Sequence, residues 1–210
     1  MKLFLIGSSG FAAEMAEALA AQLQGGMKAI AGVYDDDTRL RKNSFLGLPY
    51  LGTIGDLLDS PPADSRYVLA LPENLDREQF ASEFDRAGLR PFTVCHPSAS
   101  VSPTATVEDG AYLAPFAYVG PRAFIGGHAI LNVCASVGYA AHLETCVQLS
   151  PGVRISRFCR LGAGAFLGSN AVVAPGLKVG KRAKVGAGSF VYRDVPAGRF
   201  ALGVPTKLVD

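Results

Sequence analysis

Every sixth residue from Val101 to Val191 is aliphatic, without an exception. Side chains point the same way every two residues in a strand and about every 3.6 residues in a helix, so neither element produces a period of six. A parallel β-helix produces it, because each six-residue side of the coil returns one side chain to the interior. Sixteen repeats at three sides per coil predict about five coils. The positions are Val101, Val107, Leu113, Val119, Ile125, Leu131, Val137, Leu143, Leu149, Ile155, Leu161, Leu167, Val173, Val179, Val185 and Val191.

The residues around each aliphatic position fit the same coil. The residue two places earlier is small in most repeats, and the one large exception is Leu177. Prolines fall two places after the aliphatic residue, at corners rather than inside paired strands. Glycine often follows the aliphatic residue directly, and we expect a positive φ there because a corner can require it. These glycines are Gly120, Gly126, Gly138, Gly162, Gly168, Gly180 and Gly186.

The period of six is absent before residue 95, where strand patterns alternate with helix patterns. Strands alternating with helices predict a small Rossmann-like parallel α/β sheet, with ligands at the carboxyl ends of its strands. We therefore divide the chain into an α/β domain over residues 1–95 and a β-helix over residues 96–210. The predicted strands cover residues 2–6, 29–34, 67–71 and 91–95, and the predicted helices cover residues 11–23 and 75–87.

The turn between the first strand and the first helix is a candidate phosphate-binding loop. It reads G-S-S-G-F, which departs from the dinucleotide motif G-x-G-x-x-G. A short glycine turn before a helix still presents backbone N–H groups to an anion. Two aspartates follow the second strand, where carboxylates can accept hydrogen bonds from a ribose or a base. The alternative is an ordinary turn with solvated acids. The candidate substrate-binding residues are Gly7, Ser8, Ser9, Gly10, Phe11, Asp35 and Asp36.

Charge is distributed unevenly although the net charge is only +2. Residues 1–97 carry 9 Lys/Arg and 13 Asp/Glu, whereas residues 168–210 carry seven Lys/Arg and two Asp/Glu. A basic end on the coil predicts an anionic ligand of modest size, with ordinary solubilising charge as the alternative. Aromatic residues do not interleave with these charges and no long basic run exists, so we do not expect nucleic acid as a partner.

Cysteine and histidine usage argues against disulfides and metal. The four cysteines lack a C-x-x-C spacing, and Cys159 takes an inward small-residue position, so we expect reduced thiols. The histidines of the coil, His128 and His142, are fourteen residues apart and form no close pair, so we expect no metal. No apolar stretch is long enough to span a membrane, and the first residues lack a secretory h-region. These features predict a cytoplasmic protein.

The combination of a G-S-S-G-F α/β domain, a hexapeptide coil and a closing G-V-P-T-K segment resembles one family over essentially the whole chain. It is similar to the bacterial sialic acid O-acetyltransferases and nucleotide-sugar N-acetyltransferases. The resemblance implies a left-handed β-helix, a homotrimer with active sites between subunits, acetyl-CoA as donor and an N-terminal domain that holds a UDP- or GDP-linked amino sugar. It leads us to expect Asn132 on the substrate side. The residues expected to bind acetyl-CoA are Gln148, Gly168, Lys178, Lys184, Gly186, Pro205 and Lys207.

The chain departs from this family's motif at the catalytic corner. Family members typically read Asn-x-x-Ala-x-Val-x-His-Asp/Glu, and the motif aligns without a gap from Asn132. Tyr139 stands in place of the catalytic histidine, and Ala140 stands in place of the neighbouring acid. Gln148 stands in place of a second histidine that lies by the acetyl group in relatives.

These departures bear on the acceptor. Acyl transfer to a hydroxyl needs a base, and tyrosine with an unperturbed pKa of about 10 is a poor base at neutral pH. A neutral amine already carries its nucleophilic lone pair, so transfer to it can depend on positioning and oxyanion stabilisation. We therefore expect N-acetylation of a nucleotide-linked amino sugar for surface glycan synthesis, with Tyr139, His142 or the substrate itself replacing the base. The alternative is a trimeric scaffold that lost catalysis and still binds a sugar nucleotide or a partner.

Overall fold

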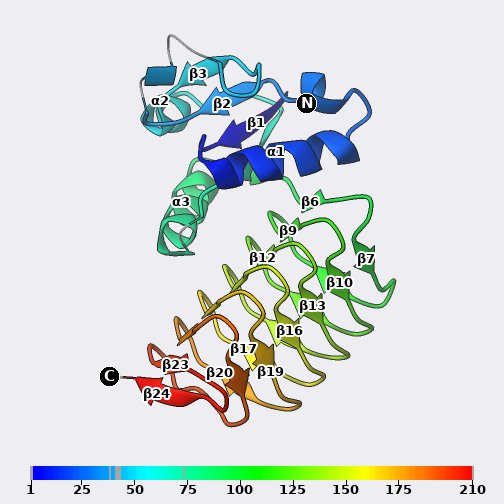
Figure 1. The fold of residues 1–210 in the computed structure, drawn as a ribbon. Coiled ribbons are helices and arrows are strands. Elements are labelled where there is room, and N and C mark those ends of the chain that lie inside the picture. Colours follow the sequence, from blue (N-terminus) through cyan, green and yellow to red (C-terminus); the bar gives the residue numbers. More distant parts are fainter. Residues whose placement is uncertain (1, 38, 41–43, 73, 210) are drawn as a thin grey trace. The chain divides into compact units, whose positions relative to one another are not determined.

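The computed structural model describes residues 2–37, 39–40, 44–72 and 74–209. The chain divides into two compact units, Met1–Cys95 and His96–Asp210 (Figure 1). The first unit is an α/β domain, and the second is a left-handed parallel β-helix. The structure therefore confirms the fold class that the sequence predicted for each unit.

The first unit contains a parallel five-stranded sheet in the order β3-β2-β1-β4-β5. Side chains alternate between its faces, so Phe4 and Ile6 of β1 pack in one cluster with Leu57 of α2 and Phe84 of α3. The strands are β1 (Lys2–Ile6), β2 (Gly32–Tyr34), β3 (Tyr50–Gly52), β4 (Ser65–Leu69), β5 (Arg90–Pro91) and β6 (Val94–Cys95). The helices are α1 (Gly10–Gln22), the 3₁₀ helix η1 (Gly26–Ala29), α2 (Ile54–Asp59) and α3 (Asn74–Arg86).

Several boundaries in this unit differ from the prediction. The strand predicted from residue 29 begins only at Gly32, because η1 occupies Gly26–Ala29. The strand predicted at residues 91–95 is two short strands, β5 and β6. Strand β3 and helix α2 were not predicted at all. Helix α2 has only six residues and depends on a capping box, in which the side chains of Thr53 and Asp56 each accept from the other's backbone N–H.

The second unit winds through three sheets, whose strands appear as a regular stack in Figure 1 and are parallel except for the antiparallel pair β23 and β24 at the end of the chain. We call the first sheet face 1, in the order β22-β19-β16-β13-β10-β7, and the second sheet face 2, in the order β20-β17-β14-β11-β8. Face 3 contains the order β24-β23-β21-β18-β15-β12-β9. From β7 to β22 paired strands are eighteen residues apart, as Tyr118 with Ser136 and Ser136 with Arg154. The last coil is shorter, because Lys184 of β21 pairs with Phe200 of β23.

Nearly every strand of the coil has two residues, an outward one followed by the inward aliphatic one. Strands on face 1 are β7 (Ser100–Val101), β10 (Tyr118–Val119), β13 (Ser136–Val137), β16 (Arg154–Ile155), β19 (Val172–Val173) and β22 (Phe190–Val191). Strands on face 2 are β8 (Thr106–Val107), β11 (Phe124–Ile125), β14 (His142–Leu143), β17 (Arg160–Leu161) and β20 (Lys178–Val179). Strands on face 3 are β9 (Tyr112–Leu113), β12 (Ile130–Leu131), β15 (Gln148–Leu149), β18 (Phe166–Leu167), β21 (Lys184–Val185), β23 (Phe200–Leu202) and β24 (Lys207–Val209).

The inward aliphatic residues form the core of the coil. All of them from Leu113 to Val191 are buried, whereas Val101 is 36% exposed and Val107 is half-buried at the first turn. The small positions beside them are buried from Ala111 onward, except that the large residue Leu177 is half-buried. The period of six therefore marks the interior from the third repeat onward.

The glycines that directly follow the aliphatic residues do not have the expected positive φ, so this prediction is wrong. They are glycine because a side chain would strike the next coil: a Cβ on Gly162 would lie 2.5 Å from the Lys181 nitrogen, and one on Gly126 would lie 2.6 Å from the Glu144 carbonyl carbon. Positive φ occurs two places later, at corner residues of many types, such as Arg122 (φ 57°) and Ala140 (φ 52°).

Candidate active site

The expected site residues of the coil lie on all three of its sides. Tyr139 lies at the corner after β13 of face 1, and His142 lies on β14 of face 2. Gln148 and Lys184 point outward from face 3, in one row with Phe166 between them. The register therefore places Gln148 and Lys184 together on face 3, away from the Tyr139 corner of the same copy, whereas Lys178 lies on face 2.

Tyr139 contacts one side chain from the coil before it and one from the coil after it. Arg122 Nη1 donates a hydrogen bond to the Tyr139 hydroxyl oxygen at 3.0 Å, and the guanidinium carbon lies 5.8 Å from the ring centroid. The Phe158 ring meets the Tyr139 ring edge-on, with centroids 5.4 Å apart and an interplanar angle of 89°. Tyr139 itself is 38% exposed, so the ring is held in place and remains accessible.

His142 belongs to a different group of side chains. Its ring stacks on Phe124 with centroids 4.5 Å apart and planes 7° apart. Phe124, His142 and Arg160 are direct neighbours in the register of face 2, as the spacing of eighteen predicts. The ring contacts of His142 and Tyr139 are thus with different partners, and the prediction that one of them replaces the family's base stays a prediction.

Asn132 lies at the corner that follows face 3, one coil before the Gln148 strand. Its backbone N–H donates to Leu149, and its side-chain oxygen accepts from the N–H of Val133 at 2.7 Å. Gly168 and Gly186 follow at the same corner in later coils. A Cβ on Gly168 would lie 2.6 Å from the Ala187 nitrogen, and one on Gly186 would strike Leu202. The structure thus gives these two glycines a packing role, and a role for them in acetyl-CoA binding stays a prediction.

Basic residues gather on the last coils. Lys178 extends from face 2 and Lys184 from face 3, and both are exposed. Lys207 begins β24 and lines a cavity of about 360 Å³ together with Arg193, Thr206 and Asp194. Pro205 precedes this strand. The arrangement offers several cations to an anionic ligand.

The candidate phosphate loop of the α/β unit joins β1 to α1. Gly7 has a φ of 103°, and a Cβ there would lie 2.9 Å from the Ala70 carbonyl oxygen, so close backbone packing requires glycine. Ser9 caps the helix by accepting from the Ala12 N–H at 3.3 Å. Gly10 has open space where a side chain would be, and Phe11 is half-buried. With Ser8 half-buried between them, these residues form an accessible helix N-terminus at the carboxyl end of β1.

The two candidate aspartates have hydrogen bonds within the domain. One carboxylate oxygen of Asp35 accepts from the Asp37 N–H at 2.7 Å. Asp36 is exposed and accepts from the Ile54 N–H at 3.0 Å, at the start of α2. Arg39 Nε donates a hydrogen bond to the Asp37 carboxylate at 2.8 Å, and this bond is the main reason why the pKa of Asp37 is lowered. Asp36 therefore has a structural role that the sequence did not indicate.

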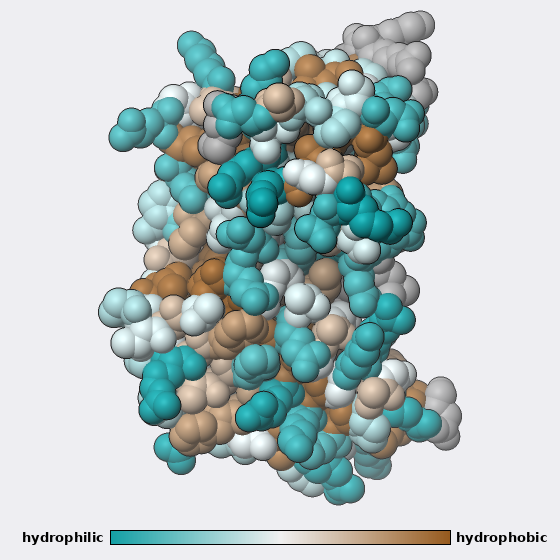
Figure 2. Space-filling model, turned by 180° about the vertical axis from the view of Figure 1, so that it is seen from behind, coloured by the Kyte–Doolittle hydropathy of each residue, from teal (hydrophilic) through white to brown (hydrophobic). Residues whose placement is uncertain are grey.

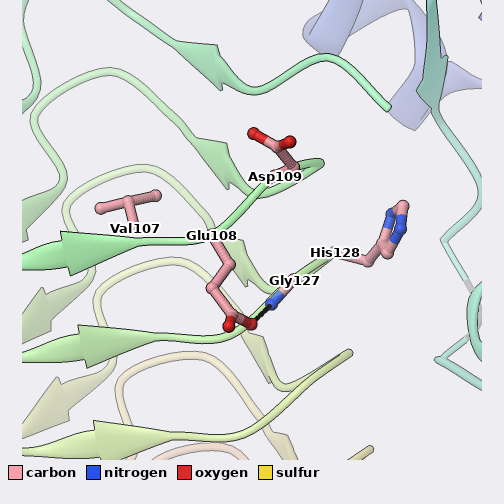
Figure 3. Close-up of a pocket in the computed structure, with 5 residues that line it drawn as sticks. All are labelled: Val107, Glu108, Asp109, Gly127 and His128. Carbon is pink, nitrogen blue, oxygen red and sulfur yellow. Dashed lines mark hydrogen bonds between the residues drawn. The ribbon is translucent and has the colours of Figure 1, made fainter. Parts of the chain in front are cut away.

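A second cavity of the coil lies at its early turns and has a volume of about 500 Å³. Figure 3 shows Glu108 reaching from one coil to Gly127 on the next, where its carboxylate accepts from the backbone N–H at 2.9 Å. Asp109 and His128 line the same cavity. Within the described ranges, no group of three or more His, Cys, Asp or Glu side chains could hold a metal ion, and no helix is long and apolar enough to cross a membrane.

Comparison with known proteins identifies both units. Residues 2–84 match the PglD N-terminal domain, and residues 158–193 match the bacterial transferase hexapeptide (six repeats). A solved structure of a histidine-to-asparagine mutant of perosamine N-acetyltransferase from Caulobacter crescentus, in complex with CoA and GDP-perosamine, is 30% identical with a TM-score of 0.92. The match covers 100% of this chain and 97% of that chain. This chain belongs to the nucleotide-sugar N-acetyltransferase family. The resemblance stated from the sequence is confirmed.

Other structures of this N-acetyltransferase fold agree over the full length. The acetyltransferase domain of PglB from Neisseria gonorrhoeae FA1090 is 28% identical with a TM-score of 0.90, and the match covers 99% of each chain. WeeI from Acinetobacter baumannii AYE is 24% identical with a TM-score of 0.89 and full coverage of both chains, which shows the fold. No curated protein matches the chain.

Sequence reasoning missed Arg122 and Phe158 as the neighbours of Tyr139. A signal for them was present in the period, because residues at one corner recur every eighteen positions. Arg122 and Phe158 lie eighteen residues before and after Ala140, next to Tyr139. Applying this spacing to the corner, and not only to the strands, would have brought both residues to the site.

Proposed function

We propose that this chain is an acetyl-CoA-dependent N-acetyltransferase that acts on a nucleotide-linked amino sugar in glycan biosynthesis. The observation that carries the proposal is the full-length match, at 30% identity, to an N-acetyltransferase crystallised with CoA and GDP-perosamine. Acetyl-CoA supplies the acetyl group. The acceptor nitrogen forms a bond to the carbonyl carbon, the carbon–sulfur bond breaks, and the amine loses one proton while CoA leaves as its thiol.

Exposed lysine side chains of the β-helix fit an anionic acetyl donor such as acetyl-CoA. Lys178, Lys184 and Lys207 belong to the last coils, where CoA phosphates would find several positive charges and the cavity lined by Lys207. Gln148 lies in the same row as Lys184, two coils earlier. We assign these residues of face 3, with Lys178 of face 2, to the donor. We assign the helix N-terminus at residues 7–11 to the phosphates of the sugar nucleotide.

The proposal includes a homotrimer in the cytoplasm with the site between neighbouring copies. Its support is the distribution of candidate residues, since Tyr139 and the Gln148 row lie on different sides of one coil. Large apolar side chains are also exposed on this unit, among them Phe116 at 67% and Phe158 at 53%, and apolar patches lie among hydrophilic ones in Figure 2. Sedimentation velocity measures the assembly directly.

The decisive experiment is an acceptor panel. Purified protein is incubated with acetyl-CoA and, separately, GDP-, UDP- and dTDP-linked amino sugars, and release of the CoA thiol is followed. We expect release with one class of amino sugar and none with its N-acetylated form, which serves as the matched control. No release from any acceptor at high enzyme concentration would contradict the proposal.

A donor-binding test uses the charge of face 3. Lys184→Glu should raise KM for acetyl-CoA about tenfold or more, because it removes one charge and adds a repulsive one. Arg154→Glu, an exposed change of the same sign on face 1, is the matched control and should leave KM within about twofold.

The second candidate function is a scaffold that binds a sugar nucleotide without catalysis. The observation that favours it is the simultaneous presence of Tyr139, Ala140 and Gln148 at positions where the family motif has chemically active residues. The two functions separate in a thermal-shift measurement, since a ligand that binds the native state raises its melting temperature. A shift with a nucleotide sugar and none with acetyl-CoA would favour the scaffold.

A further inference from the structure

The Tyr139 corner contains a side-chain arrangement that the family motif does not describe. Arg122, Ala140 and Phe158 are equivalent residues of three successive coils, and all three have positive φ, between 52° and 61°. Backbone hydrogen bonds hold the corner together: Ala140 N–H donates to Pro121, and Phe158 N–H donates to Tyr139. The direction in which each side chain leaves the corner is therefore fixed by the backbone.

Ala140 lies one coil after Arg122 and one coil before Phe158, and it offers the arginine no carboxylate. An acid at position 140 would lie between the coils of Arg122 and Phe158, and it would be the natural ion-pair partner of the arginine. With a methyl group there, Arg122 Nη1 instead donates to the Tyr139 hydroxyl at 3.0 Å. The Phe158 edge holds the ring from the other side at 5.4 Å.

The chemistry of this pair is directional. A guanidinium has only donors, so the Tyr139 oxygen is the acceptor and the phenolic proton cannot be given to Arg122. The proton remains available for an acceptor outside the chain, and the 38% exposure of Tyr139 leaves the hydroxyl within reach of a ligand.

From this geometry we propose that Arg122 is a positioning residue that presents the Tyr139 hydroxyl as a hydrogen-bond donor to the reacting thioester, in place of the family's base. The inference rests on the proposed function. As the amine nitrogen attacks, charge develops on the carbonyl oxygen, and a donor placed there stabilises it without a net transfer of the phenolic proton. The proton that leaves the nitrogen goes to water, and the CoA thiolate takes up a proton from water.

Kinetics of single and double variants test this assignment. Tyr139→Phe removes only the hydroxyl and should lower kcat about 10- to 100-fold, with KM for acetyl-CoA within about twofold. Arg122→Met should cause a similar loss, and Arg122→Lys should recover part of it because it keeps a donor. The double variant Tyr139→Phe/Arg122→Met should be no slower than Tyr139→Phe, because the arginine acts through the hydroxyl.

The pH dependence and two matched controls complete the test. Over about pH 6 to 8, where an ordinary phenol keeps its proton, the rate should follow ionisation of the acceptor amine in the wild type and in Tyr139→Phe alike. Tyr118→Phe and Arg154→Met make the same chemical changes on face 1 and should leave kcat unchanged.

Three results would overturn the assignment. First, the wild-type rate could rise with pH in a step that is absent from Tyr139→Phe. That result would make Tyr139 a base rather than a hydrogen-bond donor. Multiplicative losses in the double variant would show that Arg122 acts independently, and full activity of Tyr139→Phe would exclude any catalytic role for the hydroxyl. A wild type that is inactive on every acceptor would instead refute the proposed function, so the two failures are distinguishable.

Discussion

At the scale of single residues, the corners of the coil use two different kinds of position. Where a glycine follows the aliphatic residue, the short distance to the next coil favours it, as at Gly162, and many corner residues two places later adopt positive φ. Asparagine tolerates positive φ better than most residues, and Asn170 shows this with a φ of 59°. At Gly162 a side chain would strike the next coil, whereas a corner residue with positive φ can carry one.

Substitutions at these two positions should therefore differ in their effect on stability. Gly162→Ala places a Cβ 2.5 Å from the Lys181 nitrogen and should lower the free energy of unfolding by about 1–3 kcal/mol or more. Gly188 has a φ of 66°, open space around its Cβ direction, and Asn170 one coil earlier. Gly188→Asn should stay within about 0.5 kcal/mol in denaturant unfolding. Equal losses of unfolding free energy in Gly162→Ala and Gly188→Asn would contradict the distinction between the two kinds of position.

Cysteine reactivity tests the inward assignment at a single thiol. Cys159 is fully buried in the coil, and burial is the main cause that raises its pKa, whereas Cys134 is exposed. A raised pKa leaves less of the reactive thiolate at a given pH, so iodoacetamide should modify Cys134 in the native protein at about pH 8 and Cys159 only after denaturation. Mass spectrometry of peptides measures both rates. Fast native labelling of Cys159 would place it outside the core.

At the scale of elements, helix α2 illustrates how a short segment depends on a residue far away in sequence. Asp36 lies eighteen residues before Ile54, and its carboxylate accepts the first N–H of the helix. A six-residue helix has little stability of its own, so its caps matter. The sequence suggested Asp36 as a substrate contact because nothing local shows this partner.

Asp36→Ala should lower the free energy of unfolding by about 0.5–1 kcal/mol through loss of the cap. Asp36→Asn keeps an acceptor oxygen and should retain most of this stability. Asp59→Ala, at the other end of α2, removes an acid from a helix C-terminus and should cause no loss. Thermal unfolding compares the three variants. A loss of nucleotide-sugar affinity in Asp36→Asn without a change in melting temperature would restore the substrate role.

At the scale of the whole molecule, the coil depends on an interior that excludes charge. Val137 is fully buried between Val119 and Ile155 of the neighbouring coils. Val137→Asp would bury an unpaired carboxylate, which costs several kcal/mol, and we expect no folded protein. Ser136→Asp is the matched control, because the adjacent residue points outward beside Arg154 and should be tolerated. Circular dichroism and size-exclusion chromatography show whether each variant is folded. A folded Val137→Asp protein would show that the inward assignment of Val137 is wrong.

The sequence by itself determined the coil, because the period of six is a local pattern that recurs in every repeat. Three sides of six residues give the register of eighteen, so even the pairing of Phe124 with His142 could be predicted. The α/β class followed in the same way from alternating strand and helix patterns. The resemblance of the sequence indicated the family, and the comparisons with known proteins confirmed it.

Only the tertiary structure decided the partners of individual side chains. Gly162 is required by an inter-coil distance, Asp36 by a helix start, and Tyr139 by contacts with Arg122 and Phe158. A repeat pattern specifies which way a side chain points but not what it meets, because the partner's own conformation and the spacing between chain segments are set in three dimensions. The chemistry of the Tyr139 corner depends on those contacts.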